Sequence, residues 1–91
     1  MRKETMAETD KKRVEVRAKM SGVFYRRPSP DESPYVEVGS VVKKKQVLAL
    51  LETMKVFQKV KSPASGEIVE IAAQHESAVK DDDLLFVIQV G

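Results

Sequence analysis

The sequence contains no cysteine and has no long hydrophobic run. Without cysteine, disulfides and thiolate metal sites are excluded. The longest unbroken apolar runs, residues 47–51 and 84–88, have five residues each, whereas a membrane helix needs about 20. No basic start is joined to an apolar stretch and a cleavage site, so we expect no secretory signal. These absences favour a soluble intracellular protein, which we expect in the cytoplasm, with no membrane partner.

Aromatic residues and net charge are also low. Aromatic side chains make up 5% of the chain, and 16 Lys and Arg against 14 Asp and Glu give a net charge of +2. The basic clusters at residues 26–27 and 43–45 therefore indicate solvated edges, because no groove-reading helix is visible. His75 stands alone in an expected loop, and residues 81–83 are typical of a turn, not of a calcium loop. We expect neither a nucleic-acid partner nor a metal site.

The hydrophobic pattern changes at residue 13. Residues 1–12 are polar and heavily charged, and nothing apolar recurs there at regular spacing, so we expect a flexible tail. Residues 13–91 suit one small domain, in which apolar and polar residues alternate in short segments with no convincing helical period. The expected strands cover residues 14–18, 23–25, 41–42, 47–51, 56–60, 67–71, 79–80 and 84–90. This pattern predicts an all-β fold, either a small sandwich or a flattened barrel.

Two parts of the sequence repeat each other. Residues 40–51 align with residues 77–88 at a constant offset of 37, with apolar on apolar and turn on turn. Residues 21–22 align with residues 65–66 at an offset of 44, so the first half contains seven extra residues. These extra residues must lie in or near 26–38, where there are three prolines. The repeat predicts two half-motifs related by a pseudo-two-fold axis, one of which has a protruding loop.

A predicted hairpin at residues 52–57 lies between the two halves, with Lys55 at its tip. By the pseudo-symmetry, the two ends of the chain should lie at the opposite end of the barrel. A lysine amine on a flexible four-carbon stem suits a stable amide link, and a rigid barrel beneath the hairpin would present it outward. The amine is protonated at neutral pH, so a dedicated enzyme would have to acylate it. We interpret Lys55 as an attachment point for a carried group, and we predict no catalytic residue.

The residues around this lysine resemble a known motif. Glu52-Thr53-Met54-Lys55 is similar to the Glu-Ala-Met-Lys motif of biotinyl domains, and the chain resembles in particular the biotin carboxyl carrier proteins of acetyl-CoA carboxylase. Residues 20–25 resemble the early strands of that family, and residues 27–32 resemble its thumb loop. Residues 62–66 resemble the turn after its hairpin. The resemblance covers residues 14–90, which is nearly all of the chain beyond the tail.

The resemblance implies a fold and a function. The family fold is a flattened β-barrel of two four-stranded antiparallel sheets with a protruding thumb, here residues 26–36. The lysine that matches Lys55 carries biotin through an amide formed by biotin protein ligase. The biotin is carboxylated at a biotin carboxylase and gives the carboxyl group to acetyl-CoA at a carboxyltransferase, which forms malonyl-CoA for fatty acid synthesis. The chain would then be a non-catalytic carrier, and we expect the isolated domain to be monomeric.

The candidate cofactor-binding residues fall into two groups. Lys55 is the biotin attachment point, and its hairpin neighbours are candidates for recognition by the ligase, although they could also be ordinary exposed hairpin residues. The second group is the thumb, whose prolines make it stiff enough to limit where a biotin arm rests, although it could also be a tolerated insertion. The hairpin neighbours are Glu52, Thr53, Met54 and Val56, and the thumb residues are Pro28, Ser29, Pro30, Asp31, Glu32, Ser33, Pro34 and Tyr35.

The sequence departs from the family pattern at two positions. Lys45 replaces the usual glycine in the turn before a buried strand, and lysine at positive φ would be strained, so we expect another turn type there. Asp82, its partner in the repeat, tolerates positive φ better. Thr53 replaces alanine beside the modified lysine, and a β-branched residue suits an extended hairpin arm.

Two alternative functions remain from the sequence. The first is a lipoyl carrier domain of a 2-oxoacid dehydrogenase complex, because that domain shares the barrel and the hairpin lysine. Lipoyl domains generally have Asp-Lys-Ala at the tip and lack a proline-rich thumb, whereas here Met54 precedes and Val56 follows Lys55. The second is an unmodified interaction or nucleic-acid-binding barrel, which strong salt-dependent binding to oligonucleotides would support.

Overall fold

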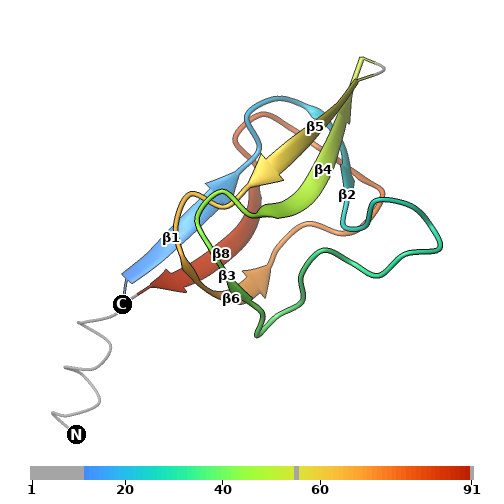
Figure 1. The fold of residues 1–91 in the computed structure, drawn as a ribbon. Coiled ribbons are helices and arrows are strands. Elements are labelled where there is room, and N and C mark those ends of the chain that lie inside the picture. Colours follow the sequence, from blue (N-terminus) through green and yellow to red (C-terminus); the bar gives the residue numbers. More distant parts are fainter. Residues whose placement is uncertain (1–11, 55, 91) are drawn as a thin grey trace, which may run out of the picture.

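The computed structural model describes residues 12–54 and 56–90, and these residues form eight strands in two antiparallel sheets (Figure 1). In chain order the strands are β1 (Lys12–Arg17), β2 (Gly22–Tyr25), β3 (Val41–Val42), β4 (Val47–Thr53), β5 (Val56–Lys61), β6 (Gly66–Ile71), β7 (Ser77–Val79) and β8 (Leu84–Val90). The predicted all-β fold of two four-stranded sheets is confirmed. Lys12, which the sequence pattern puts in the tail, is the first residue of β1, and residues 1–11 lie outside the described residues.

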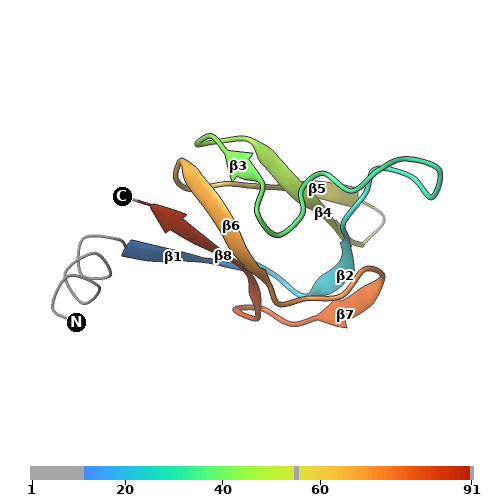
Figure 2. The same cartoon turned by 90° about the horizontal axis from the view of Figure 1, so that it is seen from below.

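The strands surround a common interior (Figure 2). One sheet has the order β1-β8-β6-β3, and the other has the order β5-β4-β2-β7. Phe24 of one sheet and Phe86 of the other are fully buried, and their ring centroids lie 5.7 Å apart. Each sheet therefore closes one side of the same core.

The core explains why β4 and β8 have nearly continuous apolar sequences. These two strands lie inside their sheets, paired on both edges, and contribute consecutive buried residues to the interior. The outer strand β5 is instead exposed over most of its length. The largest fully buried side chains are Phe24, Phe86, Leu48, Ile68, Leu85, Ile88 and Val42.

The predicted pseudo-symmetry is present in the strands and in their hydrogen bonds. β1 and β5 lie 44 residues apart, β4 and β8 lie 37 residues apart, and each pair occupies equivalent places in the two sheet orders. The amide of Gly39 donates to the carbonyl of Ile68 at 2.7 Å, and the equivalent amide of Glu76 donates to that of Phe24 at 2.6 Å. Both donors have positive φ, +99° at Gly39 and +64° at Glu76. The two halves therefore share one backbone plan.

The turns before β4 and β8 are also equivalent, which corrects one expectation. Lys45 has φ +75° and Asp82 has φ +76°, so the lysine adopts the left-handed conformation and the turn type does not change. The amide of Lys45 donates to the carbonyl of Ser62 at 2.7 Å, and that of Asp82 donates to the carbonyl of Ala18 at 2.7 Å. These bonds hold the backbone in place and offset the strain on the lysine.

The hairpin between β4 and β5 lies at one end of the barrel (Figure 1). At the other end Lys12 of β1 is paired with Val90 of β8. The predicted placement of the chain ends opposite the hairpin is thus confirmed for the described residues. Among these residues we find no helix with the length and apolar character needed to cross a membrane.

Candidate functional site

The hairpin is closed by the pair Thr53 and Val56, which leaves a two-residue turn. Its first residue, Met54, has φ +48°, and positive φ is the usual conformation in two-residue hairpin turns because it matches the twist of the strands. Its second residue, Lys55, lies outside the described residues, so its role remains a prediction. The flanking strands pair continuously from residues 50–53 to residues 56–59, and this pairing gives the turn a firm base.

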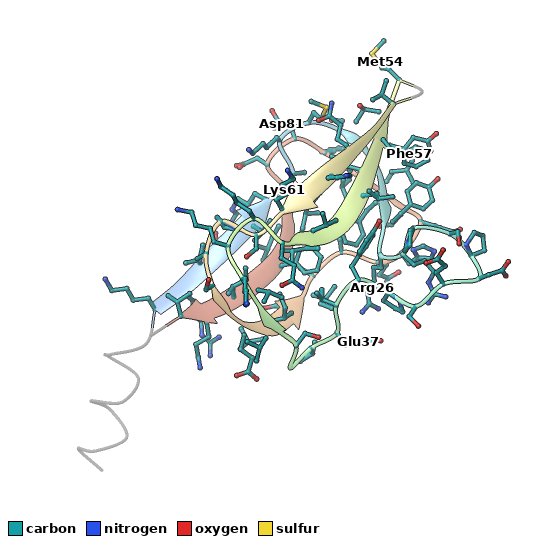
Figure 3. All side chains as sticks on the ribbon, viewed as in Figure 1. Arg26, Glu37, Met54, Phe57, Lys61 and Asp81 are labelled. Atoms are coloured by element: carbon teal, nitrogen blue, oxygen red, sulfur yellow. The ribbon has the colours of Figure 1, made fainter. Side chains whose placement is uncertain are left out.

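The described residues around the turn are strongly exposed. The side chain of Met54 is 94% exposed and points away from the barrel (Figure 3). Val56 and Phe57 are each 55% exposed. Large apolar side chains in such positions are favourable contacts for a partner protein, since they contribute little to the core of this domain.

Tyr25 ties the base of the hairpin to β2. Its hydroxyl donates to Glu52 Oε1 at 3.0 Å, and its ring lies 5.7 Å from that of Phe57. The hydrogen bond to the carboxylate stabilises the neutral phenol and raises the pKa of Tyr25 above its ordinary value. Glu52, a sequence candidate for ligase recognition, thus has a structural contact as well.

The thumb is anchored at both of its roots. The amide of Tyr35 donates to the carbonyl of Arg26 at 2.9 Å and closes the loop. The Arg26 guanidinium donates to the carbonyl of Val36 and to Glu37 Oε1, both at 3.0 Å. Figure 3 shows Arg26 and Glu37 close together at this root. Residues 31–33, at the far end of the thumb, are exposed.

A hollow of about 160 Å³ separates the thumb from the hairpin. Of the predicted thumb, residues 27–30 line it, whereas the candidate site residues 31–35 do not. Phe57 of the predicted hairpin lines it too, and so do Tyr25 and His75, which the sequence alone does not place in the site. Its full lining is Tyr25, Arg27, Pro28, Ser29, Pro30, Leu50, Phe57, His75 and Glu76.

Metal ligation has no support in the described part of the chain. No cluster of three or more His, Asp or Glu side chains is arranged there to hold an ion. His75 instead accepts a hydrogen bond at Nδ1 from the backbone amide of Arg26, at 3.0 Å.

Comparison with known families identifies the type of domain. Residues 14–88 match the biotin/lipoyl family described as "Biotin-requiring enzyme". The chain belongs to this family. Its cofactor is biotin, and the described hairpin fits an attached group, because the turn lies beyond the last strand pair and its first residue is almost fully exposed.

Two relatives show which members of the family are similar. The chloroplastic biotin carboxyl carrier protein of acetyl-CoA carboxylase from Glycine max is 45% identical over 74 residues, which is 81% of this chain and 28% of the relative. The biotin carboxyl carrier protein of acetyl-CoA carboxylase from Nostoc sp. is 35% identical over 80 residues, 88% of this chain and 44% of the relative. The chain therefore spans less than half the length of these relatives.

Solved structures agree on the fold. The urea carboxylase of Kluyveromyces lactis matches with a TM-score of 0.71 and 23% identity, over 85% of this chain and 6% of that protein. A single-chain, multi-domain long-chain acyl-CoA carboxylase matches with a TM-score of 0.69 and 20% identity, over 82% of this chain and 7% of that protein. In both matches the similar region is a small part of a much larger carboxylase.

Proposed function

We propose that this chain is a biotin carboxyl carrier in which the amine of Lys55 bears biotin through an amide bond. The observation that supports this most is the hairpin turn, where a lysine follows an almost fully exposed methionine at the end of the barrel opposite the paired ends of β1 and β8. The names of the relatives favour biotin over lipoate. In this function the chain itself catalyses nothing.

The role of the carrier is to position the attached biotin. Biotin, when attached, supplies the group that accepts a carboxyl at one catalytic site and gives it up at another. The continuous pairing of β4 with β5 fixes the direction of the tip, and the core below keeps the hairpin rigid. The flexible lysine stem supplies the reach, so tethering gives an effective concentration on the order of mM near each site.

We assign three partners to the carrier. Biotin protein ligase would attach the biotin, and Met54, Val56 and Phe57 offer it an exposed apolar contact beside Lys55. A biotin carboxylase would load the carboxyl group, and a carboxyltransferase would pass it to acetyl-CoA for fatty acid synthesis. We place this process in the cytoplasm, or in the plastid stroma if the source is a plant.

The thumb has a part in this proposal. Its prolines and the bond between Tyr35 and Arg26 make it a firm projection beside the hairpin. The hollow between the two is open to a group extending from the tip, so the thumb limits where the arm rests.

Intact-mass measurement after co-expression with biotin ligase tests the attachment. We expect one biotin per chain, because the motif offers one lysine at the tip. Lys55→Arg should abolish the modification, whereas the matched change Lys59→Arg, on the exposed arm of the same hairpin, should leave it intact. A lipoyl increment, an unmodified chain or a biotinylated Lys55→Arg protein would contradict the proposal.

Removing the thumb tests its role. Deletion of residues 28–34 takes out seven residues, the number by which the first half exceeds the second. We expect the barrel to fold and to accept biotin, because the core and hairpin contacts lie outside the deleted segment. The rates at which biotin carboxylase and carboxyltransferase use the carrier should change. Unchanged rates would mean that the thumb is a neutral insertion.

A further inference from the structure

The chain has one histidine, and it lies where the thumb, the hairpin and the second half of the barrel meet. His75 belongs to the loop between β6 and β7, and its side chain is 29% exposed. Its Nδ1 accepts the backbone amide of Arg26, the first residue of the thumb loop, at 3.0 Å. Its ring meets that of Tyr25 edge-on, with centroids 5.8 Å apart.

These contacts form a continuous connection from the thumb to the hairpin. The Arg26 amide contacts His75, the imidazole packs on Tyr25, and the Tyr25 hydroxyl donates to Glu52 of β4 at 3.0 Å. His75 also lines two hollows, the one between thumb and hairpin and a second one behind the thumb root. The imidazole therefore forms part of the wall that sets the distance between these two elements.

The pseudo-symmetry shows that the fold itself does not need this histidine. The position equivalent to His75 in the first half is Val38, which cannot accept a hydrogen bond through its side chain. The main-chain bonds that both halves share are made by the next residues, Gly39 and Glu76. The bond from Arg26 to His75 is additional to this shared plan, and it is made where the thumb begins.

We propose that His75 is a positioning residue that holds the root of the thumb against the base of the hairpin, and that its protonation removes this contact and loosens the root. The Nδ1 atom accepts a hydrogen bond only when it carries no proton, so the contact with Arg26 requires the neutral imidazole. Histidine is the side chain whose charge changes between about pH 5 and 8. Protonation turns Nδ1 into a donor that faces the amide donor of Arg26, so this hydrogen bond is lost.

Charged side chains lie around the ring. Glu76 lies 3.6 Å from Nε2, and Glu37 lines the hollow behind the root. Arg26 lines the hollow behind the root, and Arg27 lines the hollow between thumb and hairpin. Tyr25 is another titratable group beside the imidazole, and the two rings form a T-shaped pair. Protonation thus removes the hydrogen bond from Arg26, whereas the contact of Nε2 with Glu76 is already present.

Amide and ring NMR signals of the unmodified chain between pH 5 and 8 test the proposal. We expect the Arg26 amide proton to shift upfield with the same midpoint as the His75 ring, and the order parameters of Ser29, Asp31, Glu32 and Ser33 to fall below that midpoint. The Gly39 amide is the internal control, because it donates to a carbonyl that does not titrate. An Arg26 amide that stays constant while the His75 ring titrates would overturn the proposal.

Two substitutions separate the hydrogen bond from simple packing. His75→Asn keeps a neutral acceptor close to the position of Nδ1, so the thumb should stay ordered across the whole pH range. His75→Phe keeps a ring against Tyr25 but has no acceptor, so the thumb should be loose at every pH. Equal thumb order parameters in the two variants would refute the positioning role. These measurements need no biotin, so their outcome is independent of the proposed carrier function. Only the effect of the thumb on the position of a biotin arm rests on that function.

Discussion

β4 and β5 hold the same places in one sheet that β8 and β1 hold in the other. The first pair is joined by the Met54-Lys55 turn, whereas at the equivalent place Lys12 and Val90 are paired but not joined to each other. The first half also carries the thumb, and the second half has a five-residue loop, 72–76, in its place. The backbone plan is thus duplicated, and the features that make a site occur once. The symmetric strands form the rigid base, and the features of the proposed function, the hairpin turn and the thumb, are those that only one half has.

Substitution of the strand glycines is expected to have the largest effect and should be similar in the two halves. A Cβ on Gly22 would meet the backbone oxygen of Glu52, and one on Gly66 would meet that of Gln89. Because backbone cannot move aside easily, Gly22→Ala and Gly66→Ala should each lower the free energy of unfolding by about 3 kcal/mol. Gly39→Ala is the matched control, since nothing lies near its Cβ position and only its φ of +99° is unfavourable. It should cost roughly 1 kcal/mol.

Urea denaturation of the three variants measures these differences. Similar losses for the two strand glycines would confirm that equivalent positions of the halves are equally constrained. A loss at only one of them would show that the symmetry of the backbone does not extend to packing.

A smaller difference in the free energy of unfolding is expected when glycine replaces the two turn residues with matching φ. Lys45 and Asp82 adopt the same left-handed conformation, but aspartate tolerates it better than lysine. Lys45→Gly should therefore raise the free energy of unfolding by about 0.5 kcal/mol, after the entropy of a more flexible unfolded chain is subtracted. Asp82→Gly should change it little. Thermal or urea unfolding checks both, and an equal gain at the two positions would mean that the strain does not depend on the side chain.

The smallest effect concerns a contact that only the hairpin side possesses. Val69 and Gln89 take the places of Tyr25 and Glu52 in the second half, so this half lacks a phenol bonded to a carboxylate. The raised pKa of Tyr25 means that the neutral phenol adds stability below the ordinary tyrosine value of about 10. This contribution is lost as the pH rises through the raised value of the folded state.

Ultraviolet titration of a Tyr35→Phe background isolates Tyr25, because the chain has two tyrosines. The folded protein should ionise at higher pH than the same protein in urea, and Glu52→Gln should reduce the difference. Identical folded and unfolded midpoints would show that the hydrogen bond to Glu52 has no influence in solution.

Much of the fold could be predicted from the sequence because it depends on local signals. Alternating apolar residues predicted the strands, and the change of offset from 37 to 44 located the thumb between residues 26 and 38. The left-handed Lys45 was not expected, because propensity alone disfavours it. The hydrogen bond from the Lys45 amide to the carbonyl of Ser62 holds the turn in that conformation, and Ser62 lies beyond the hairpin in the sequence.

The candidate site was only partly predictable, because it too depends on contacts between segments that are distant in the sequence. Met54 and Val56 could be placed beside Lys55 from the motif, but Tyr25 and His75 could not be assigned to the site. Their roles depend on contacts between segments 27 and 49 residues apart, the Tyr25 hydroxyl with Glu52 and the Arg26 amide with His75. From the sequence alone, His75 is a lone histidine in a loop, with no pattern that indicates a partner for it. A signal that could have indicated its role is its position in the short loop that faces the thumb insertion in the repeat.

The pairing of Lys12 with Val90 has a mechanical consequence. Antiparallel hydrogen bonds run perpendicular to their strands, so tension applied at these two adjacent points would open the β1–β8 ladder one bond at a time, like a zipper. A ladder loaded in this way separates at low force, and the hairpin at the far end of the barrel would be the last part to bear the tension.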